Sequence, residues 1–439
     1  MSRVKITQFL IIITVLIQTC LGGLVDGENM VVAGVPLHDM TTIILFLYMI
    51  ITYKEVKSRI TPFNRLVLAY IILVTLIIIS MPFREKESLA DAFLAGRRYY
   101  ILLIAFVIDD NIYYSGSKRF VTRVIYALGI YYSLIGILNY IDPHLINTYF
   151  PGLRNGFDDE KNVLTRNFIS ENIGLLFIHF SFVYKGVSIM LNQSERKFVD
   201  FFLLLFYLAG MFFIGLRAPL FSILLAFAFV YILYSKRLTD LHAFSGIKQI
   251  QYFLVAVLLV ICVNDVFDNR PFNFAESVVN DVSGTSNTRE NTYTGRIKRA
   301  LVYQIPQAMK QPLFGVGLIY KNTPAAKEHR YDRQSSNRVR DLYNMDFGYG
   351  TLWVTFGLLG AGIIIYCISR AIIEVYRQSS ICLVEDYLQL MVILIAFLIC
   401  NYTWAVLRDG CGLIILAFSC SIANETYSNF HNNFLTGNK

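Results

Sequence analysis

The chain has 439 residues, of which 55% are apolar and only 16% charged, and its formal net charge is +8. Soluble domains carry roughly a quarter charged residues, so this composition excludes an ordinary soluble protein. A basic balance is typical of proteins that meet nucleic acid or anionic lipid. Because the sequence has no Arg/Lys-rich helix and no nucleic-acid motif interleaved with aromatic residues, we expect an anionic lipid-linked ligand and no nucleic acid.

The apolar residues fall in blocks of about 15 to 22, the length that a helix needs to cross a hydrocarbon core about 30 Å thick. We therefore predict an all-α polytopic membrane protein with about twelve transmembrane helices. The predicted spans are 6–23, 40–53, 65–83, 99–114, 124–141, 167–190, 199–216, 218–234, 250–267, 347–368, 387–403 and 410–424. They divide the chain into helices one to nine (1–267), a large loop (268–345) and helices ten to twelve (346–439).

The first span has an alternative interpretation. The basic start, Met1 to Lys5, followed by an apolar run to Gly23, is also typical of a cleaved signal peptide. No convincing small-x-small cleavage site follows it, so we keep this segment as a membrane span. Removal of the segment would not change the orientation of the other spans.

Short loops with many Lys and Arg residues stay on the cytoplasmic side of a membrane. With the N-terminus inside, the inner segments hold 17 Lys and Arg residues and the short outer loops hold eight. Both termini are therefore predicted to be cytoplasmic. The loop 268–345 then lies outside, and its length exempts it from the charge rule.

This outer loop carries 12 Lys and Arg residues against seven acids. It is either a solvated loop or an anion-binding cap over a site at the membrane surface. Apolar residues recur in it at every fourth position: Ile297, Leu301, Ile305 and Met309. The spacing predicts an amphipathic helix in the interface, with its apolar side toward lipid or the bundle. Pro306 should kink it, and Arg296 and Arg299 would lie level with lipid headgroups.

Signatures of soluble enzymes and metal sites are missing from the sequence. It contains no P-loop, GxSxG elbow, dinucleotide fingerprint or paired HxxxH motif, and its six histidines are scattered. The seven cysteines lie in or near apolar blocks without CxxC spacing, which is typical of packing residues. We expect no metal and no cofactor.

Arg217 is the most informative single residue, because it lies between two apolar runs in Gly215-Leu216-Arg217-Ala218-Pro219. An arginine near membrane depth is costly and usually pairs with a partner. Pro219 suits the first turn of the helix that follows, whose free N–H groups favour anions. The alternative is an arginine that extends to the lipid headgroups.

Arg166 has a similar position at the start of the sixth span, and Glu171 and Asn172 are polar residues about one turn into that span. These polar groups either satisfy each other and neighbouring helices or line an aqueous cavity with Arg166. Asp346 closes the outer loop just before Tyr349 and the tenth span. It is either a helix N-cap or a desolvated general base for a sugar hydroxyl.

Four segments, in this order, resemble the O-antigen ligase and polymerase superfamily, in particular the Wzy-type polysaccharide polymerases. Arg166 to Gly174 is similar to the family's Arg…Pro-Asn-x-x-Gly pattern, with Glu171 in place of proline. Gly215 to Leu220 resembles its Ser-Arg-Gly-Ala-Leu helix start. The turn Pro312-Leu313-Phe314-Gly315-Val316-Gly317 and the segment Asp346 to Gly360 are similar to the end of its outer loop.

The resemblance implies a metal-independent glycosyltransferase of the GT-C type in the bacterial inner membrane, with its site on the periplasmic face. Its substrates would be undecaprenyl-diphosphate-linked oligosaccharides within membrane lipid, and a polysaccharide chain-length regulator stays open as a protein partner. Asp346 and Arg217 would be catalytic. Binding of diphosphate or sugar would fall to Arg166, Asn172, Arg296, Arg299 and Tyr349.

Two other functions stay open. Ligases of this superfamily, which attach polymer to lipid A core, typically have His-Asn where this chain has Asp346-Phe347, and Asp-x-Gly-Tyr is a pattern associated with polymerases. The polymerase is therefore preferred to the ligase. A lipid-linked oligosaccharide flippase, from a different class, would show two similar halves. This chain has no obvious internal repeat, and its outer loop makes the halves unequal.

Overall fold

The computed structural model of the protein describes residues 2–19, 24, 31–32, 35–58, 60–141, 148–150, 176–191, 193, 197–214, 217–240, 304–320, 323–325, 348–381, 383–402, 405–407 and 410–435. The regular secondary structure in this part of the chain is helical, apart from the antiparallel pair β1 (Val31–Val32) and β2 (Val35–Pro36). The chain divides into two compact units. The first unit comprises Met1–Thr19, Glu28–Thr122 and Arg296–Lys439, and the second comprises Cys20–Gly27 and Arg123–Gly295.

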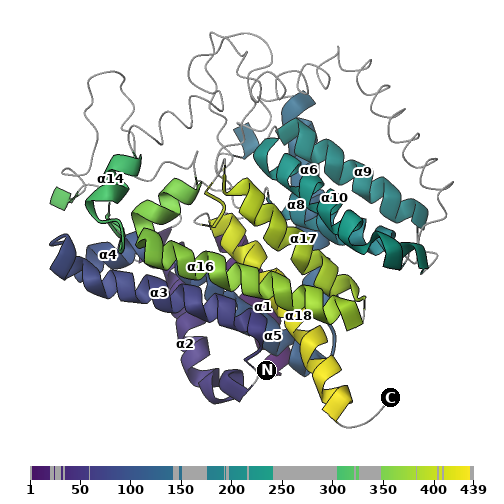
Figure 1. The fold of residues 1–439 in the computed structure, drawn as a ribbon, viewed down its shortest axis with the longest axis horizontal. Coiled ribbons are helices and arrows are strands. Elements are labelled where there is room, and N and C mark those ends of the chain that lie inside the picture. Colours follow the sequence, from purple (N-terminus) through teal and green to yellow (C-terminus); the bar gives the residue numbers. More distant parts are fainter. Residues whose placement is uncertain are drawn as a thin grey trace. The chain divides into compact units, whose positions relative to one another are not determined.

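The first unit is a bundle of long helices with a short helix from the outer loop. In chain order its helices are α1 (Arg3–Gln18), α2 (Leu37–Ser58), α3 (Pro62–Arg84), α4 (Leu89–Gly96), η3 (Arg97–Leu103), α5 (Ile104–Ser115), α14 (Ile305–Lys310), α16 (Gly348–Ile381), α17 (Glu385–Cys400) and α18 (Gly410–Leu435). The helix α6 (Arg119–Ile141) begins in this unit and continues in the second. Figure 1 shows α3 and α16 side by side, and α18 packs on α5.

Local chemistry explains where several of these helices begin and end. The Thr61 hydroxyl accepts from the N–H of Asn64, and Pro62 follows it at the first helical position, where a missing N–H costs nothing. Ser88 caps α4 through the N–H of Asp91. Gly116, with a φ of 63°, ends α5 in the left-handed conformation.

Polar side chains gather at one end of the first unit. Arg3 donates to Asp110 at 2.8 Å and lies 2.5 Å from a carboxylate oxygen of Glu55, and the Tyr48 hydroxyl donates to Asp110 at 2.5 Å. Asn64, at the start of α3, donates to Asp109 at 2.5 Å. These contacts place the beginning of α1 and α3 and the end of α2 and α5 together. The first predicted span is thus packed into the bundle.

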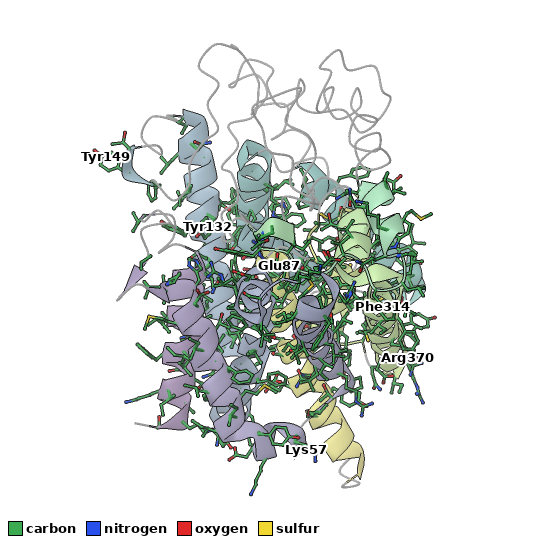
Figure 2. The ribbon with its side chains drawn as sticks, turned by 90° about the vertical axis from the view of Figure 1, so that its left-hand side faces the viewer. Lys57, Glu87, Tyr132, Tyr149, Phe314 and Arg370 are labelled. Carbon is green, nitrogen blue, oxygen red and sulfur yellow. The ribbon has the colours of Figure 1, made fainter. Side chains whose placement is uncertain are left out.

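The opposite end of the first unit holds the described segment 304–320 of the predicted outer loop. Arg84, the last residue of α3, donates to Gln311 of that loop at 2.5 Å. Figure 2 shows Lys57, in the last turn of α2, far from Glu87, which follows α3. Since α1 starts at the other end, the start of the first helix and the segment 304–320 lie at opposite ends of this unit, and the orientation of the chain in the membrane stays a prediction.

The second unit contains the remainder of α6, α8 (Leu176–Met190), α9 (Lys197–Ile214) and α10 (Arg217–Asp240). Small residues let these helices approach closely: a Cβ added to Gly129 would lie 2.1 Å from the Ser181 hydroxyl oxygen. Lys185 pairs with Asp200 at 2.6 Å, which joins α8 to α9.

The prediction of an all-α membrane protein is confirmed. Three described helices are long and apolar enough to cross a membrane: Pro62–Arg84, Arg119–Asn139 and Gly348–Ile381. Shorter apolar helices cover Leu176–Met190, Phe198–Met211 and Pro219–Ser235. The predicted ninth span, 250–267, lies outside the described residues, so the number of twelve spans stays a prediction.

The fourth predicted span differs in detail from the structure. Residues 97–103 form a 3₁₀-helix, and the α-helix starts only at Ile104. In the outer loop, the structure describes a helix from Ile305 to Lys310, with Pro306 in its first turn. The earlier part of the predicted amphipathic helix, with Ile297 and Leu301, lies outside the described residues, so the kink at Pro306 stays a prediction. Gln307 and Ala308 are buried, whereas Met309 is 61% exposed. Met309 is therefore not buried against the bundle, which leaves the other predicted orientation of the apolar stripe, toward lipid.

Candidate functional site

The centre of the candidate site is a break in α16 at Gly357, whose φ of 68° and ψ of 179° are not helical. A break in a membrane helix leaves backbone groups without partners, and these must be satisfied inside the protein. The outer-loop turn 312–317 supplies the partners. Leu358 N–H donates to Pro312 at 2.8 Å, Leu359 N–H to Leu313 at 3.1 Å, and Val316 N–H to the carbonyl of Val354 at 2.7 Å. The turn thus docks into the broken helix.

Two glycines make this docking possible. Gly315 has a φ of 69° and Gly357 a φ of 68°, a region that side chains with a Cβ rarely adopt. A Cβ on Gly315 would lie 2.5 Å from the nitrogen of Gly357, and a Cβ on Gly357 would lie 2.2 Å from the carbonyl oxygen of Leu313. The sequence predicted close backbone approach at this turn, and the structure identifies the helix that it approaches.

Arg84 holds the same turn from the end of α3. Its guanidinium donates to the Gln311 side-chain oxygen at 2.5 Å and to the Gly315 carbonyl. Gln311 in turn donates to Glu85 at 2.5 Å. Sequence reasoning counted Arg84 only as one positive charge of an outer loop. No periodic pattern links it to a turn more than two hundred residues away.

The start of α16 is fastened to the end of α17. Tyr349 N–H donates to the carbonyl of Asn401 at 3.1 Å, and the Tyr349 hydroxyl donates to the carbonyl of Leu398 at 2.6 Å. A Cβ on Gly348 would lie 2.3 Å from the side-chain oxygen of Asn401, so only glycine permits this approach. The first turn of α16 therefore has a fixed position in the first unit.

Glu87 attaches the outer loop at a second point. The Thr323 hydroxyl donates to it at 2.5 Å, and its side chain is only 3% exposed. Burial raises the pKa of Glu87, and the charges of Asp91 and Glu85 act in the same direction, whereas the hydrogen bond from Thr323 opposes them. Its carboxylate is therefore costly to keep ionised.

Replacing Glu87 by glutamine should increase the stability of the protein at neutral pH. A carboxyl whose pKa is raised in the folded state stabilises the fold while it is protonated, and this contribution is complete below its ordinary pKa of about 4. The contribution is lost as the pH rises through the raised pKa. Melting temperatures in detergent between pH 4 and 8 should therefore fall more steeply with pH for the wild type than for Glu87→Gln. As a control, Glu374→Gln also removes one carboxylate charge, from the part of α16 that follows the break at Gly357. A wild-type slope in the Glu87→Gln protein would contradict the prediction.

Most of the predicted site residues lie outside the described part of the chain: Asp346, Arg166, Asn172, Arg296 and Arg299. Arg217 begins α10, as predicted, and Pro219 lies in its first turn, but the Arg217 side chain is not among those described. Tyr349 is half-buried in the first turn of α16. Among the described residues, no group of three or more His, Cys, Asp or Glu side chains is placed to hold a metal ion.

The comparisons with known proteins concern the segment that holds this docked turn. The family model described as O-antigen ligase matches residues 202–365, which include α10, the turn 312–317 and the break in α16. This match covers less than half of the chain. No curated protein matches the sequence. The family match supports the O-antigen ligase and polymerase superfamily and a role in surface polysaccharide assembly in a membrane. It does not separate a polymerase from a ligase.

Proposed function

We propose that the chain is a polysaccharide polymerase of the O-antigen type. It transfers a growing undecaprenyl-diphosphate-linked glycan onto a lipid-linked repeat unit at the periplasmic face of the inner membrane. The observation that carries the choice is Asp346-Phe347, followed by Gly348-Tyr349, where ligases of this superfamily have His-Asn. The match to residues 202–365 supports the superfamily.

The reaction is a displacement at a sugar carbon. A hydroxyl of the acceptor repeat unit attacks the anomeric carbon of the growing chain, a new glycosidic bond forms, and the bond to the diphosphate oxygen breaks. Undecaprenyl diphosphate leaves with the electron pair. Asp346 accepts the proton of the attacking hydroxyl and so acts as the general base.

The leaving diphosphate calls for fixed positive charge. Arg217 is proposed to stabilise the charge that develops on it, because a guanidinium fork matches phosphate oxygens and binds two of them at once. Arg166 and Asn172 of the sixth predicted span would hold the diphosphate or the sugar, together with Arg296 or Arg299 of the outer loop. Guanidinium charge then serves in place of a metal ion.

Tyr349 is proposed to bind sugar from the first turn of α16. Its hydroxyl hydrogen is already donated to Leu398, so its oxygen can only accept a hydrogen bond from a sugar hydroxyl, or its ring can stack on the sugar face. The two contacts that fasten Tyr349 to α17 support this role, because a binding group must hold its position. The docking of the turn 312–317 also supports this role, because it holds α16 at residues 354–359, a short distance along the helix from Tyr349.

A ligase is the second enzymatic candidate, favoured by the description of the matched family. A flippase is the candidate from a different class. Deletion of the gene separates the three when the lipopolysaccharide of the deletion strain is resolved on a gel. A polymerase mutant should retain core carrying a single repeat unit, and this result is expected. Core with no repeat unit attached, while polymer accumulates on its lipid carrier, would identify a ligase instead. Repeat units trapped on the cytoplasmic face would identify a flippase.

A further inference from the structure

Asn401 has a polar side chain in the interior of the first unit. It is 0% exposed, and neither its side-chain oxygen nor its side-chain nitrogen has a hydrogen-bond partner within the described part of the chain. A buried donor or acceptor left unpaired costs about 1–3 kcal/mol. A leucine would fill a similar volume without that cost, so the carboxamide is expensive to keep.

The carboxamide lies where α17 ends and α16 begins. Asn401 is the C-cap residue of α17, and its backbone carbonyl accepts from Tyr349 N–H. Its side-chain oxygen is so close to Gly348 that a Cβ there would come within 2.3 Å. Gly348 is two residues from Asp346 in the chain, which limits the separation of those two Cα atoms to about 7 Å.

Capping of either helix does not explain this side chain. As an N-cap of α16 its oxygen would accept from an N–H of the first turn, and as a C-cap of α17 its nitrogen would donate to one of the last carbonyls. Both atoms are without such bonds in the described part of the chain. A bound molecule, either a ligand or a water, would supply the partner that balances the cost of burial.

The chemistry of the carboxamide selects the kind of ligand. It offers one acceptor and a two-hydrogen donor side by side, which matches a hydroxyl group, because a hydroxyl both donates and accepts. A phosphate oxygen only accepts, so it would leave the Asn401 oxygen unpaired and facing negative charge. Enclosure from bulk water strengthens both hydrogen bonds once a hydroxyl is seated.

We propose that Asn401 binds a hydroxyl group of the acceptor sugar beside the start of α16. This inference rests on the proposed polymerase function and adds a substrate-binding residue to it. A resident water molecule presents the same chemistry, so the test must distinguish sugar from water. Binding requires that a neighbouring segment moves aside, since Asn401 is enclosed in this structure.

The test uses the full-length protein in liposomes with lipid-linked repeat units as substrate. Asn401→Leu should raise the KM for the acceptor about tenfold, as expected for two lost hydrogen bonds, while its melting temperature equals or exceeds that of the wild type. Thr355→Val is the matched control. Thr355 also has a fully buried side-chain oxygen with no partner within the described part of the chain, but it lies about two turns along α16 from Gly348, away from the start of that helix. This control should keep the wild-type KM.

Three results would overturn the inference. An unchanged acceptor KM in Asn401→Leu, with equal or greater stability, would mean that the partner is only water. A clear loss of stability in Asn401→Leu would mean that the carboxamide has a partner within the protein. If the wild type forms polymer in the same experiments, either of these results contradicts only the role of Asn401 and leaves the proposed function intact. If the wild type itself makes no polymer, the proposed function fails, and this inference fails with it.

Discussion

Replacing Gly357 by alanine is expected to separate the outer-loop turn from α16 and to destabilise the protein by on the order of 4 kcal/mol or more. A residue with a Cβ at a φ of 68° and a ψ of 179° costs about 1–3 kcal/mol, because this region of backbone conformation is adopted almost only by glycine. The new Cβ would also lie 2.2 Å from the carbonyl oxygen of Leu313, which is backbone and cannot rotate away. If the turn withdraws, the N–H groups of Leu358 and Leu359 lose their partners. Each buried group left unpaired adds about 1–3 kcal/mol.

The loss is measured as the temperature at which half of a fluorescently tagged protein remains monodisperse in detergent. Gly362→Ala is the matched control, because it lies in the same helix and a Cβ there meets no other atom within 4 Å. Alanine favours a helix by up to about 1 kcal/mol over glycine, so this control should be as stable as the wild type or slightly more so. Equal melting temperatures for Gly357→Ala and the wild type would show that the docking of the turn 312–317 at the break in α16 contributes nothing to stability.

Substitution of Asp346 or Arg217 is expected to remove polymer almost completely from cells. Asp346→Asn keeps the size of the side chain but cannot accept the proton of the attacking hydroxyl, and general-base catalysis is worth about 10²–10⁴-fold. Arg217→Lys keeps the positive charge but loses the planar fork that binds two phosphate oxygens. Both substitutions should reduce polymer at least about 100-fold at a normal protein level, as measured by gel analysis of lipopolysaccharide in the complemented deletion strain.

Two controls match these substitutions. Asp341→Asn changes another acid of the same outer loop, and Arg237→Lys changes an arginine near the other end of α10. Both should give full-length polymer. Full-length polymer from Asp346→Ala and Arg217→Ala at normal protein level would refute the site. Cysteines introduced at the two positions should react with a membrane-impermeant reagent from the same side, and labelling from opposite faces would refute a shared site as well.

The helical fold was largely predictable, because burial in lipid requires an internal partner for every backbone group, and an apolar run of sufficient length meets this requirement only as a helix. The runs around 65–83 and 347–368 were recognised in this way, and the structure has α3 and α16 there. Their ends were less predictable. Residues 369–381 continue α16 although Arg370 and Arg377 interrupt the apolar pattern, and η3 replaces the start of an α-helix at 97–103.

The candidate site was predictable only in part. Conformational freedom at Gly315 and Gly317 indicated a turn with close backbone approach, since this property belongs to the residue itself. That Gly357 breaks α16 was not foreseen, because a glycine within an apolar run is usually tolerated in a helix. The partners of the turn, Leu358 and Val354, follow it by about forty residues, and Arg84 precedes it by more than two hundred. Local patterns do not record such pairings.

Composition, run length and loop charge thus specify a helical membrane protein and the order of its segments, because these properties depend on neighbouring residues and on the lipid alone. Three features are decided only by the packing of distant segments: the hydrogen bond from Arg84 to the outer-loop turn, the break at Gly357 and the buried carboxamide of Asn401. The reason is that a hydrogen bond requires two groups to be close in space, and residues far apart in the sequence become close only in the folded chain. The same amide in another packing would be capped or solvated.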